Sequence, residues 1–342
     1  MKVDLEGLAT TVVGSFPLSN TNSNMQKAFI DQIDIGIDFP CYPQLLSMTD
    51  EFLIPLSEKS SNLVREGHKF FLEDDLSLPE EEPIALEYGE LVLEFLEKYP
   101  DYKKQIKGVK ACLTGPFTLA SEINLRGEIS KGIAPRFFRE PKAIMLKKLV
   151  EQLARIMKNI AGRYNEMGFD IISMDEPILS LLIGRKTAFF DEKFYIQILN
   201  EAISKIEGIS SIHVCGRISP NLRDLLLKTN VNILDHEFQT SKSNFDIFKR
   251  EHFTEPDRFL AMGTLATNFN KREGASINAY VESISSLKAF IKKGFDMFGR
   301  ENLIIKPDCG FIPLKDIFDE NVAYEITYKK LSNMVSAVKE YK

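Results

Sequence analysis

Short apolar runs rich in β-branched residues alternate along this chain with longer stretches of helical periodicity. Each run ends in a polar cluster or in glycine or proline. Eight such runs occur, at residues 10–17, 35–43, 110–118, 169–177, 210–216, 231–238, 258–267 and 302–311. Strand-like runs that alternate with helices predict parallel βα units. Eight units favour an α/β fold of the closed (β/α)8 TIM-barrel type over a doubly wound sheet.

Two of the intervening stretches show the helical pattern clearly. Residues 140–167 begin with Glu-Pro and carry apolar residues at helical spacing, and Gly168 follows them as a favourable helix end. The last helix is expected over residues 322–341. The stretch 44–109 is long and acidic, and we expect it to be an inserted helical segment after strand 2. Residues 1–342 are then expected to form a single barrel domain with this insertion inside it.

The composition is that of an ordinary globular protein, with 44% hydrophobic and 27% charged residues among 342. The net charge of -6 and the absence of a long basic run argue against a nucleic-acid partner. No apolar stretch approaches the length of a membrane span or a signal peptide, so we expect a cytoplasmic protein with no membrane partner. Four cysteines are too few for a disulfide framework in a chain of this length.

Several runs end in residues that bind metals. TIM-barrel enzymes carry their chemistry at the carboxyl ends of the strands. His213 and Cys215 are two residues apart, so on a strand they share a face. Cys309 closes the eighth run and Glu237 closes the sixth, and a closed barrel brings both to the same rim. One imidazole, two thiolates and one carboxylate suit Zn²⁺.

Other reactive residues have simpler explanations. Cys41 and Cys112 are expected to be small core residues, as isolated cysteines often are. His236 lies on the opposite face of a regular strand from Glu237, so we expect it either to support a ligand indirectly or to have a structural role. Asp175 ends the fourth run, where we favour a functional role. For Glu176, a place at a helix N-terminus and a functional role are equally open.

Taken in order, these motifs resemble the catalytic barrel of the cobalamin-independent methionine synthase family. The matching pieces are TTVVGSFP, LTGPFT, MDEP, HVCG and KPDCGF, and they cover nearly the whole chain. The resemblance implies a zinc-dependent methyltransferase that converts homocysteine to methionine, with the same four side chains as zinc ligands. It also implies substrate contacts at Ser15 and the Gly14 backbone. Asp175 would be a catalytic residue whose carboxylate meets the substrate amino group.

The chain departs from the family pattern in three places. It has no counterpart to the N-terminal half of the long enzymes. Short core members take the methyl group from a corrinoid, so a methylcorrinoid protein or methylcobalamin is expected as donor rather than methyl-folate. Gln44 stands where the family has a glutamate that helps to bind the substrate ammonium. Asn268 stands where the longer enzymes carry a histidine.

The sequence leaves three alternatives. Because glutamine is a weaker partner for a cation than glutamate, coenzyme M or another thiol remains an alternative acceptor. The HVCG motif is also similar to that of methylcobamide:coenzyme M methyltransferases. A metal-free decarboxylase-type barrel is disfavoured because no arginine cluster lies at the strand ends. A binding protein with a structural zinc is disfavoured because such sites are usually compact in sequence.

Overall fold

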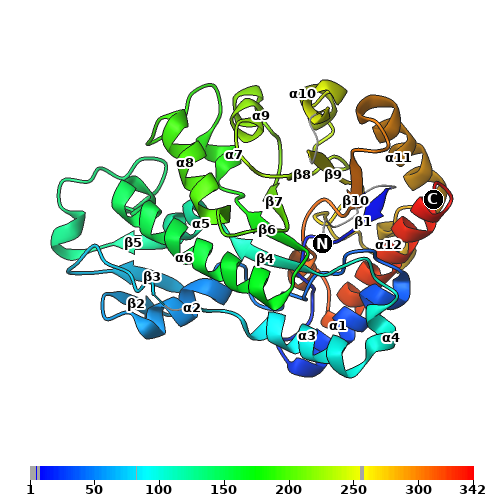
Figure 1. Ribbon diagram of the computed structural model, residues 1–342, viewed down its shortest axis with the longest axis horizontal. Helices are drawn as coiled ribbons and strands as arrows, with labels where there is room; N and C mark the ends of the chain where they lie inside the picture. Colours follow the sequence, from blue (N-terminus) through cyan, green and yellow to red (C-terminus); the bar gives the residue numbers. More distant parts are fainter. Residues whose placement is uncertain (1–4, 6–7, 82, 255–257) are drawn as a thin grey trace.

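A curled sheet of seven parallel strands forms the centre of the computed structural model, which describes residues 5, 8–81, 83–254 and 258–342 (Figure 1). Both faces of the sheet are covered, which explains why the strand sequences are almost continuously apolar. All neighbouring pairs are parallel. In order across the sheet, the strands are β1 (Ala9–Thr10), β10 (Leu303–Lys306), β9 (Phe259–Gly263), β8 (Ile233–His236), β7 (Ile209–Val214), β6 (Ile171–Asp175) and β4 (Lys110–Thr114).

Seven of the eight expected strands are therefore present, and the exception is the run at residues 35–43. This run is extended but forms no regular ladder, and Pro40 and Pro43 each remove a backbone donor from it. It lies between β1 and β4 and makes two isolated parallel bridges, Thr11–Phe39 and Cys41–Lys110, and the next residue makes a third, Ser15–Gln44. The regular sheet is thus a curled half-barrel, and the expected closed (β/α)8 barrel is confirmed only to that extent.

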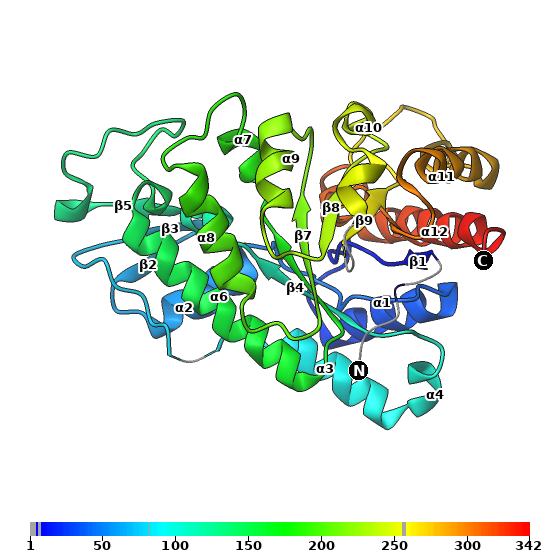
Figure 2. The same cartoon turned by 45° about the horizontal axis from the view of Figure 1, so that its top comes forward.

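Helices pack around the sheet, and Figure 2 shows α6 and α8 on the outer side of β4, β6 and β7. α6 contacts both α5 and α8, whereas α12 contacts α11 and α1 at the other end of the sheet. The longer helices of the barrel are α1 (Asn22–Ile35), α5 (Pro116–Glu122), α6 (Lys147–Met167), α8 (Glu192–Ile203), α9 (Pro220–Leu227), α11 (Ile284–Phe298) and α12 (Glu320–Lys339). Two shorter helices follow β6 and β8: α7 (Leu179–Leu182) and α10 (Asn244–Ile247).

The two helices expected from periodicity are both present. α6 starts later than expected, because Ala143–Met145 form a separate 3₁₀ turn. It ends at Gly168, which adopts a left-handed conformation with φ 97° as the C-terminal cap. α12 starts two residues before the expected position, and the side chain of Asp319 caps it by accepting from the backbone N–H of Val322.

The 44–109 segment contains more than the helices that its sequence predicts. It carries α2 (Asp50–Lys59), α3 (Glu87–Lys98) and α4 (Pro100–Lys103). Between α2 and α3 lies an unexpected hairpin of β2 (Leu63–Glu66) and β3 (Lys69–Leu72), whose turn contains Gly67 at φ 62°. β3 also pairs with β5 (Ile123–Leu125), which gives a second, three-stranded sheet beside the barrel. The segment therefore contains helices, as expected, together with a hairpin that was not expected.

Glu176 has a structural role at the start of α5. Its carboxylate accepts hydrogen bonds from the backbone N–H groups of Phe117 and Thr118, each at 2.9 Å, and from the Thr118 hydroxyl at 2.6 Å. Burial raises the pKa of Glu176 to about 7. The acid therefore ties the end of β6 to the N-terminus of α5, where negative charge and acceptors are favoured.

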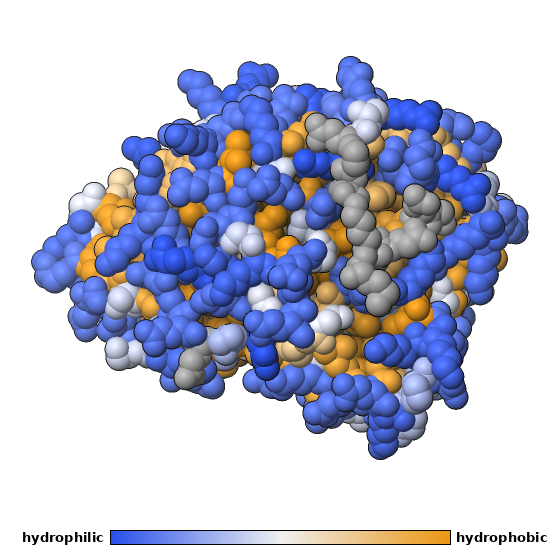
Figure 3. All heavy atoms as spheres, in the orientation of Figure 1, coloured by the Kyte–Doolittle hydropathy of each residue, from blue (hydrophilic) through white to orange (hydrophobic). Residues whose placement is uncertain are grey.

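The outer surface matches the composition. On the face in Figure 3, hydrophilic side chains cover most of the area and apolar ones show between them. Within the described part of the chain, none of the helices combines the length and the apolar character needed to cross a bilayer.

A substitution at Gly115 tests the structural role of Glu176, because a Cβ there would lie 2.1 Å from the Glu176 carboxyl carbon. We expect Gly115→Ala to displace this carboxylate and lower the free energy of unfolding by about 2 kcal/mol or more. Gly184→Ala is the matched control, because its Cβ would meet nothing within 4 Å. Urea denaturation of both variants measures the difference, and equal stability would contradict the role of Glu176.

Candidate functional site

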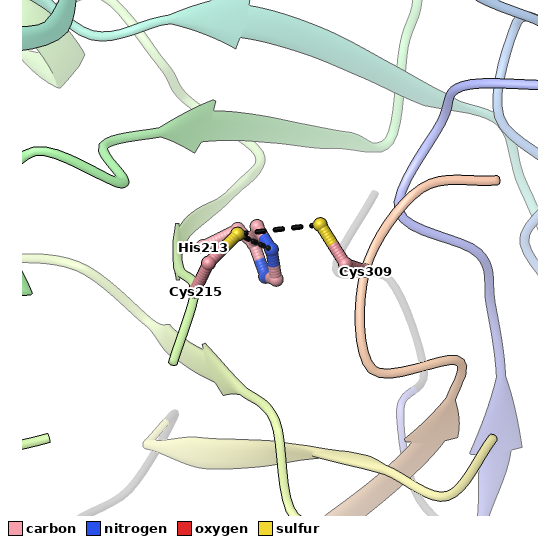
Figure 4. Close-up of side chains that lie close together, drawn as sticks. All are labelled: His213, Cys215 and Cys309. Atoms are coloured by element: carbon pink, nitrogen blue, oxygen red, sulfur yellow. Dashed lines mark hydrogen bonds between the residues drawn. The ribbon is translucent and has the colours of Figure 1, made fainter. Parts of the chain in front are cut away.

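Three potential metal ligands meet at the carboxyl ends of the strands. His213 lies on β7, Cys215 directly follows β7, and Cys309 lies in the loop after β10. Their ligand atoms all lie within 4.8 Å of one another. The His213 Nε2 is 3.1 Å from the Cys215 Sγ, which is 3.2 Å from the Cys309 Sγ. Figure 4 shows the three side chains pointing toward a common point, with Cys309 approaching from the side opposite the other two.

The curl of the sheet makes this meeting possible. His213 and Cys215 face the same way because they are two residues apart on an extended segment. β8 and β9 lie between β7 and β10 in the sheet, so a flat sheet would keep Cys309 away from both. Directly after Cys215, Gly216 adopts a φ of 78° and turns the chain out of the strand. The convergence predicted for these three residues is therefore observed.

Asp235 on β8 fixes the orientation of the His213 ring. It is the register partner of His213, and its Oδ1 lies 2.6 Å from the Nδ1 of His213. Lys306 of β10 forms a buried ion pair with Asp235. Burial alone would raise the pKa of Asp235, but Lys306 and His213 hold it well below its usual range. With Nδ1–H donating to this carboxylate, Nε2 remains free to bind a metal.

The charges around the two thiols favour a thiolate. The hydrogen bond from Cys215 contributes most to a pKa of Cys309 well below its usual value, and His213 and Lys306 act in the same direction. The pKa of Cys215 is raised by its hydrogen bond with Cys309 and by burial. Burial and Lys306 lower the pKa of His213, but Asp235 and Cys309 outweigh them and raise it to about 10. A positive charge next to the Cys309 thiolate is therefore favoured at this group, and either a proton on His213 or a metal ion in its place supplies that charge.

Glu237, the fourth expected ligand, is not part of this group in the described structure. It directly follows β8, but its Oε2 accepts hydrogen bonds from the hydroxyls of Thr240 at 3.0 Å and Ser241 at 3.1 Å. The negative charge of Glu237 contributes to the raised pKa of Cys215. This contribution is smaller than those of the Cys309 hydrogen bond and of burial. Its assignment as a ligand stays a prediction.

Asp308 joins the loop of Glu237 to the loop of Cys309, a role that sequence analysis missed. Its carboxylate accepts from the backbone N–H groups of Phe238 and Gln239, both at 3.0 Å, and of Thr240 at 2.7 Å. The Thr240 hydroxyl also donates to it, at 2.6 Å. The only sequence signal for this role is an acid directly before Cys309.

Asp175 presents an unused acceptor beside the three ligands. It ends β6 as the register partner of His213 and is 5% exposed. Its Oδ1 accepts no hydrogen bond from any residue in the described ranges. Burial raises the pKa of Asp175 to about 7, against the opposing effect of His213 and Lys110. A buried acceptor without a donor is costly, so this oxygen suits a ligand that brings its own N–H groups.

The other expected substrate residues, Gly14, Ser15 and Gln44, lie together and form a wall beside the loop after β10. The Gly14 carbonyl accepts from the Gln44 N–H at 3.0 Å. The Ser15 carbonyl accepts from the Phe311 N–H at 2.9 Å, which places this wall beside the loop of Cys309. The contact is close, since a Cβ on Gly310 would lie 2.0 Å from the Ser15 Oγ. The geometry thus places these residues near the metal ligands, while their contact with a substrate stays a prediction.

Two of the remaining cysteine and histidine expectations agree with the structure. Cys41 and Cys112 are fully buried and 3.3 Å apart at their Sγ atoms, within the hydrophobic core. His236 is also buried, and its ring stacks on Phe248 with a centroid distance of 5.1 Å. It points away from the three ligands, as a structural residue should.

A family model and two methionine synthases match this chain over much of its length. The family model for the catalytic domain of cobalamin-independent synthase matches residues 97–340. A methionine synthase of Methanothermobacter thermautotrophicus is 29% identical over 68% of this chain, an alignment that spans 63% of that enzyme. A methionine synthase of Methanothermobacter marburgensis is 27% identical over 98% of this chain and 100% of its own length.

A longer relative and a solved structure extend the comparison. A 5-methyltetrahydropteroyltriglutamate–homocysteine methyltransferase of Photorhabdus laumondii is 24% identical over 68% of this chain, which corresponds to 27% of that enzyme. The structure of a B12-independent methionine synthase from Shewanella sp. W3-18-1 superposes with a TM-score of 0.64 and 17% identity. It covers 97% of each chain and therefore supports the fold.

The contact between Asp235 and His213 predicts how tightly the group holds a metal. We expect Asp235→Asn to weaken zinc affinity roughly tenfold to a hundredfold, because a ligating histidine loses its charged hydrogen-bond partner. Competition with a chromophoric chelator measures this affinity. Asp170→Asn is the control, because Asp170 binds the Val109 N–H at the opposite, amino end of the strands. Unchanged zinc affinity in Asp235→Asn would contradict the orienting role.

Proposed function

Because this chain belongs to the cobalamin-independent methionine synthase family, we propose that it transfers a methyl group to the sulfur of homocysteine and so forms methionine. One observation carries the proposal: a thiolate-stabilising metal group and an unpartnered buried carboxylate lie side by side. The His213, Cys215 and Cys309 group suits a sulfur nucleophile, and Asp175 suits an ammonium group. Homocysteine carries both of these groups.

We propose Zn²⁺ as the metal at this group. The donors fit it, since one imidazole nitrogen and two sulfur atoms converge while Asp235 holds the other ring nitrogen. When bound, Zn²⁺ lowers the pKa of an added thiol, so that the sulfur is a thiolate at neutral pH. We retain Glu237 as the fourth protein ligand, because its half-buried side chain directly follows β8, and its charge acts on Cys215 while two hydroxyl groups donate to it.

The chain's own residues then hold the substrate in line. Asp175 accepts from the ammonium group through its free Oδ1, while Ser15 and the Gly14 backbone contact the rest of the amino acid. This anchoring directs the sulfur toward His213, Cys215 and Cys309. The new S–C bond forms as the methyl carbon leaves the donor, which keeps the bonding electron pair. Alignment of the two reacting atoms is the main contribution of the protein to the rate.

For the donor, we propose a methylated folate. The relative from Photorhabdus is named for 5-methyltetrahydropteroyltriglutamate. The corrinoid donor expected from the sequence finds no support in the relatives described above, so methylcobalamin serves as the comparison compound. Coenzyme M is the less suitable acceptor, because it lacks an amino group and its sulfonate would face the Asp175 carboxylate.

Asp175 provides the test of the acceptor. We expect Asp175→Asn to raise the KM for homocysteine roughly tenfold to a hundredfold, since a charged hydrogen bond contributes about 1.5–3 kcal/mol. The activity with a thiol that lacks an amino group should change little. The measurement is thiol-dependent demethylation of the donor, with homocysteine and coenzyme M as acceptors and with methyl-folate and methylcobalamin as donors.

Two outcomes of this experiment would overturn parts of the proposal. Turnover of coenzyme M without turnover of homocysteine would overturn the acceptor. Turnover of methylcobalamin without turnover of methyl-folate would overturn the donor and leave the acceptor intact.

A further inference from the structure

A second buried acid, Glu51 of α2, lies behind the wall formed by Gly14, Ser15 and Gln44. It is 6% exposed, and its Oε2 accepts a hydrogen bond from the Gln44 Nε2 at 2.7 Å. Its Oε1 lies 2.9 Å from the Tyr42 hydroxyl. No motif marks this residue in the sequence, and the mechanism above does not use it.

The environment of Glu51 favours its neutral form. Burial raises the pKa of Glu51 to about 8 against the lowering effect of the Tyr42 and Gln44 hydrogen bonds, and the Asp175 carboxylate adds to the rise. The proton has an acceptor within reach, because the Tyr42 hydroxyl lies 2.6 Å from the Cys112 carbonyl and can direct its own proton there. A neutral Glu51 between Gln44 and Tyr42 avoids the free-energy cost of burying a charge, which explains how the fold tolerates an acid at this position.

The contact with Glu51 determines which way the Gln44 amide faces. Its NH₂ group is directed at Glu51, so its Oε1 faces the other way, toward Gly14. A Cβ on Gly14 would lie 3.0 Å from this oxygen. The backbone of Gln44 is also fixed, since its N–H donates to Gly14 and its carbonyl accepts from Phe16. No donor from the described residues reaches Oε1, so this oxygen remains available to a ligand.

We propose that Glu51 is a positioning residue for amino-group specificity. By holding the Gln44 NH₂ group, it presents the Gln44 Oε1 as a second acceptor, beside Asp175, for the ammonium group of an α-amino thiol. This inference rests on the proposed function. It explains how the chain selects an amino acid although glutamine replaces the glutamate of the resembled family. With the amide reversed, Gln44 would direct N–H groups at a cation and disfavour its binding.

The experiment compares two ligands that differ only in the amino group: homocysteine and 4-mercaptobutyrate. Binding to the zinc-loaded protein is measured by calorimetry without a methyl donor. Glu51→Leu frees the Gln44 amide to rotate, and we expect homocysteine to bind roughly tenfold more weakly, which corresponds to one lost hydrogen bond. Binding of 4-mercaptobutyrate should be unchanged. Glu51→Gln keeps an acceptor for the Gln44 NH₂ group and should restore most of the homocysteine affinity.

A double variant exchanges the donor and the acceptor in the hydrogen bond between positions 44 and 51. In Gln44→Glu with Glu51→Gln, the amide at position 51 donates to the carboxylate introduced at position 44. That carboxylate then offers a full charge to the substrate, and homocysteine should bind more tightly than to the wild type. Gln44→Glu alone should gain less, because two carboxyl groups in contact must share a proton.

Glu58→Leu is the matched control, because Glu58 lies on the same helix but is exposed, and both ligands should bind to it as to the wild type. Three results would overturn the inference in folded protein with normal zinc content: unchanged homocysteine affinity in Glu51→Leu, equal weakening of both ligands, or a double variant no tighter than the wild type. A wild type that binds 4-mercaptobutyrate as tightly as homocysteine would overturn the proposed function itself.

Discussion

The buried hydrogen bond between Asp235 and the Nδ1 of His213 is the interaction on which the rest of the site depends. It lies on neighbouring strands, and Lys306 from β10 neutralises the carboxylate without exposing it to water. A charge buried this deeply is stable only when it is paired and hydrogen-bonded. The pairing therefore links β7, β8 and β10, the same strands whose ends carry Cys215, Glu237 and Cys309. The orientation of the His213 ring and the packing of these strands are set by one network.

The fold follows from the sequence wherever burial alone determines the structure. Seven apolar runs became strands because both faces of each are covered. The run at residues 35–43 has the same hydrophobicity, but two prolines interrupt its ladder and leave single bridges. The hairpin around Gly67 was missed because the acidic character of the 44–109 segment suggested helices. The signal that would have predicted it is two short runs, Leu63–Glu66 and Lys69–Leu72, separated by a turn that contains a glycine.

The part of the site that lies at the ends of strands could be predicted from the sequence. His213, Cys215 and Cys309 follow from spacing and from the barrel topology, and the structure brings them together. The direction of the Glu237 carboxylate depends on nearby hydroxyl groups, which no spacing rule describes. The contact of Asp235 with His213 depends on the register between β7 and β8. The contact of Glu51 with Gln44 depends on how α2 packs against the wall. These contacts appear only after the chain has folded, so no spacing in the sequence predicts them.

The central claim is that His213, Cys215 and Cys309 hold a zinc ion that takes the acceptor thiol as an additional ligand. X-ray absorption at the zinc edge of the purified protein tests this directly, with and without homocysteine. The account predicts about one zinc per chain, two sulfur neighbours without the thiol, and three with it. A sulfur count that stays the same when homocysteine binds, or a protein that binds homocysteine without any zinc, would contradict the account.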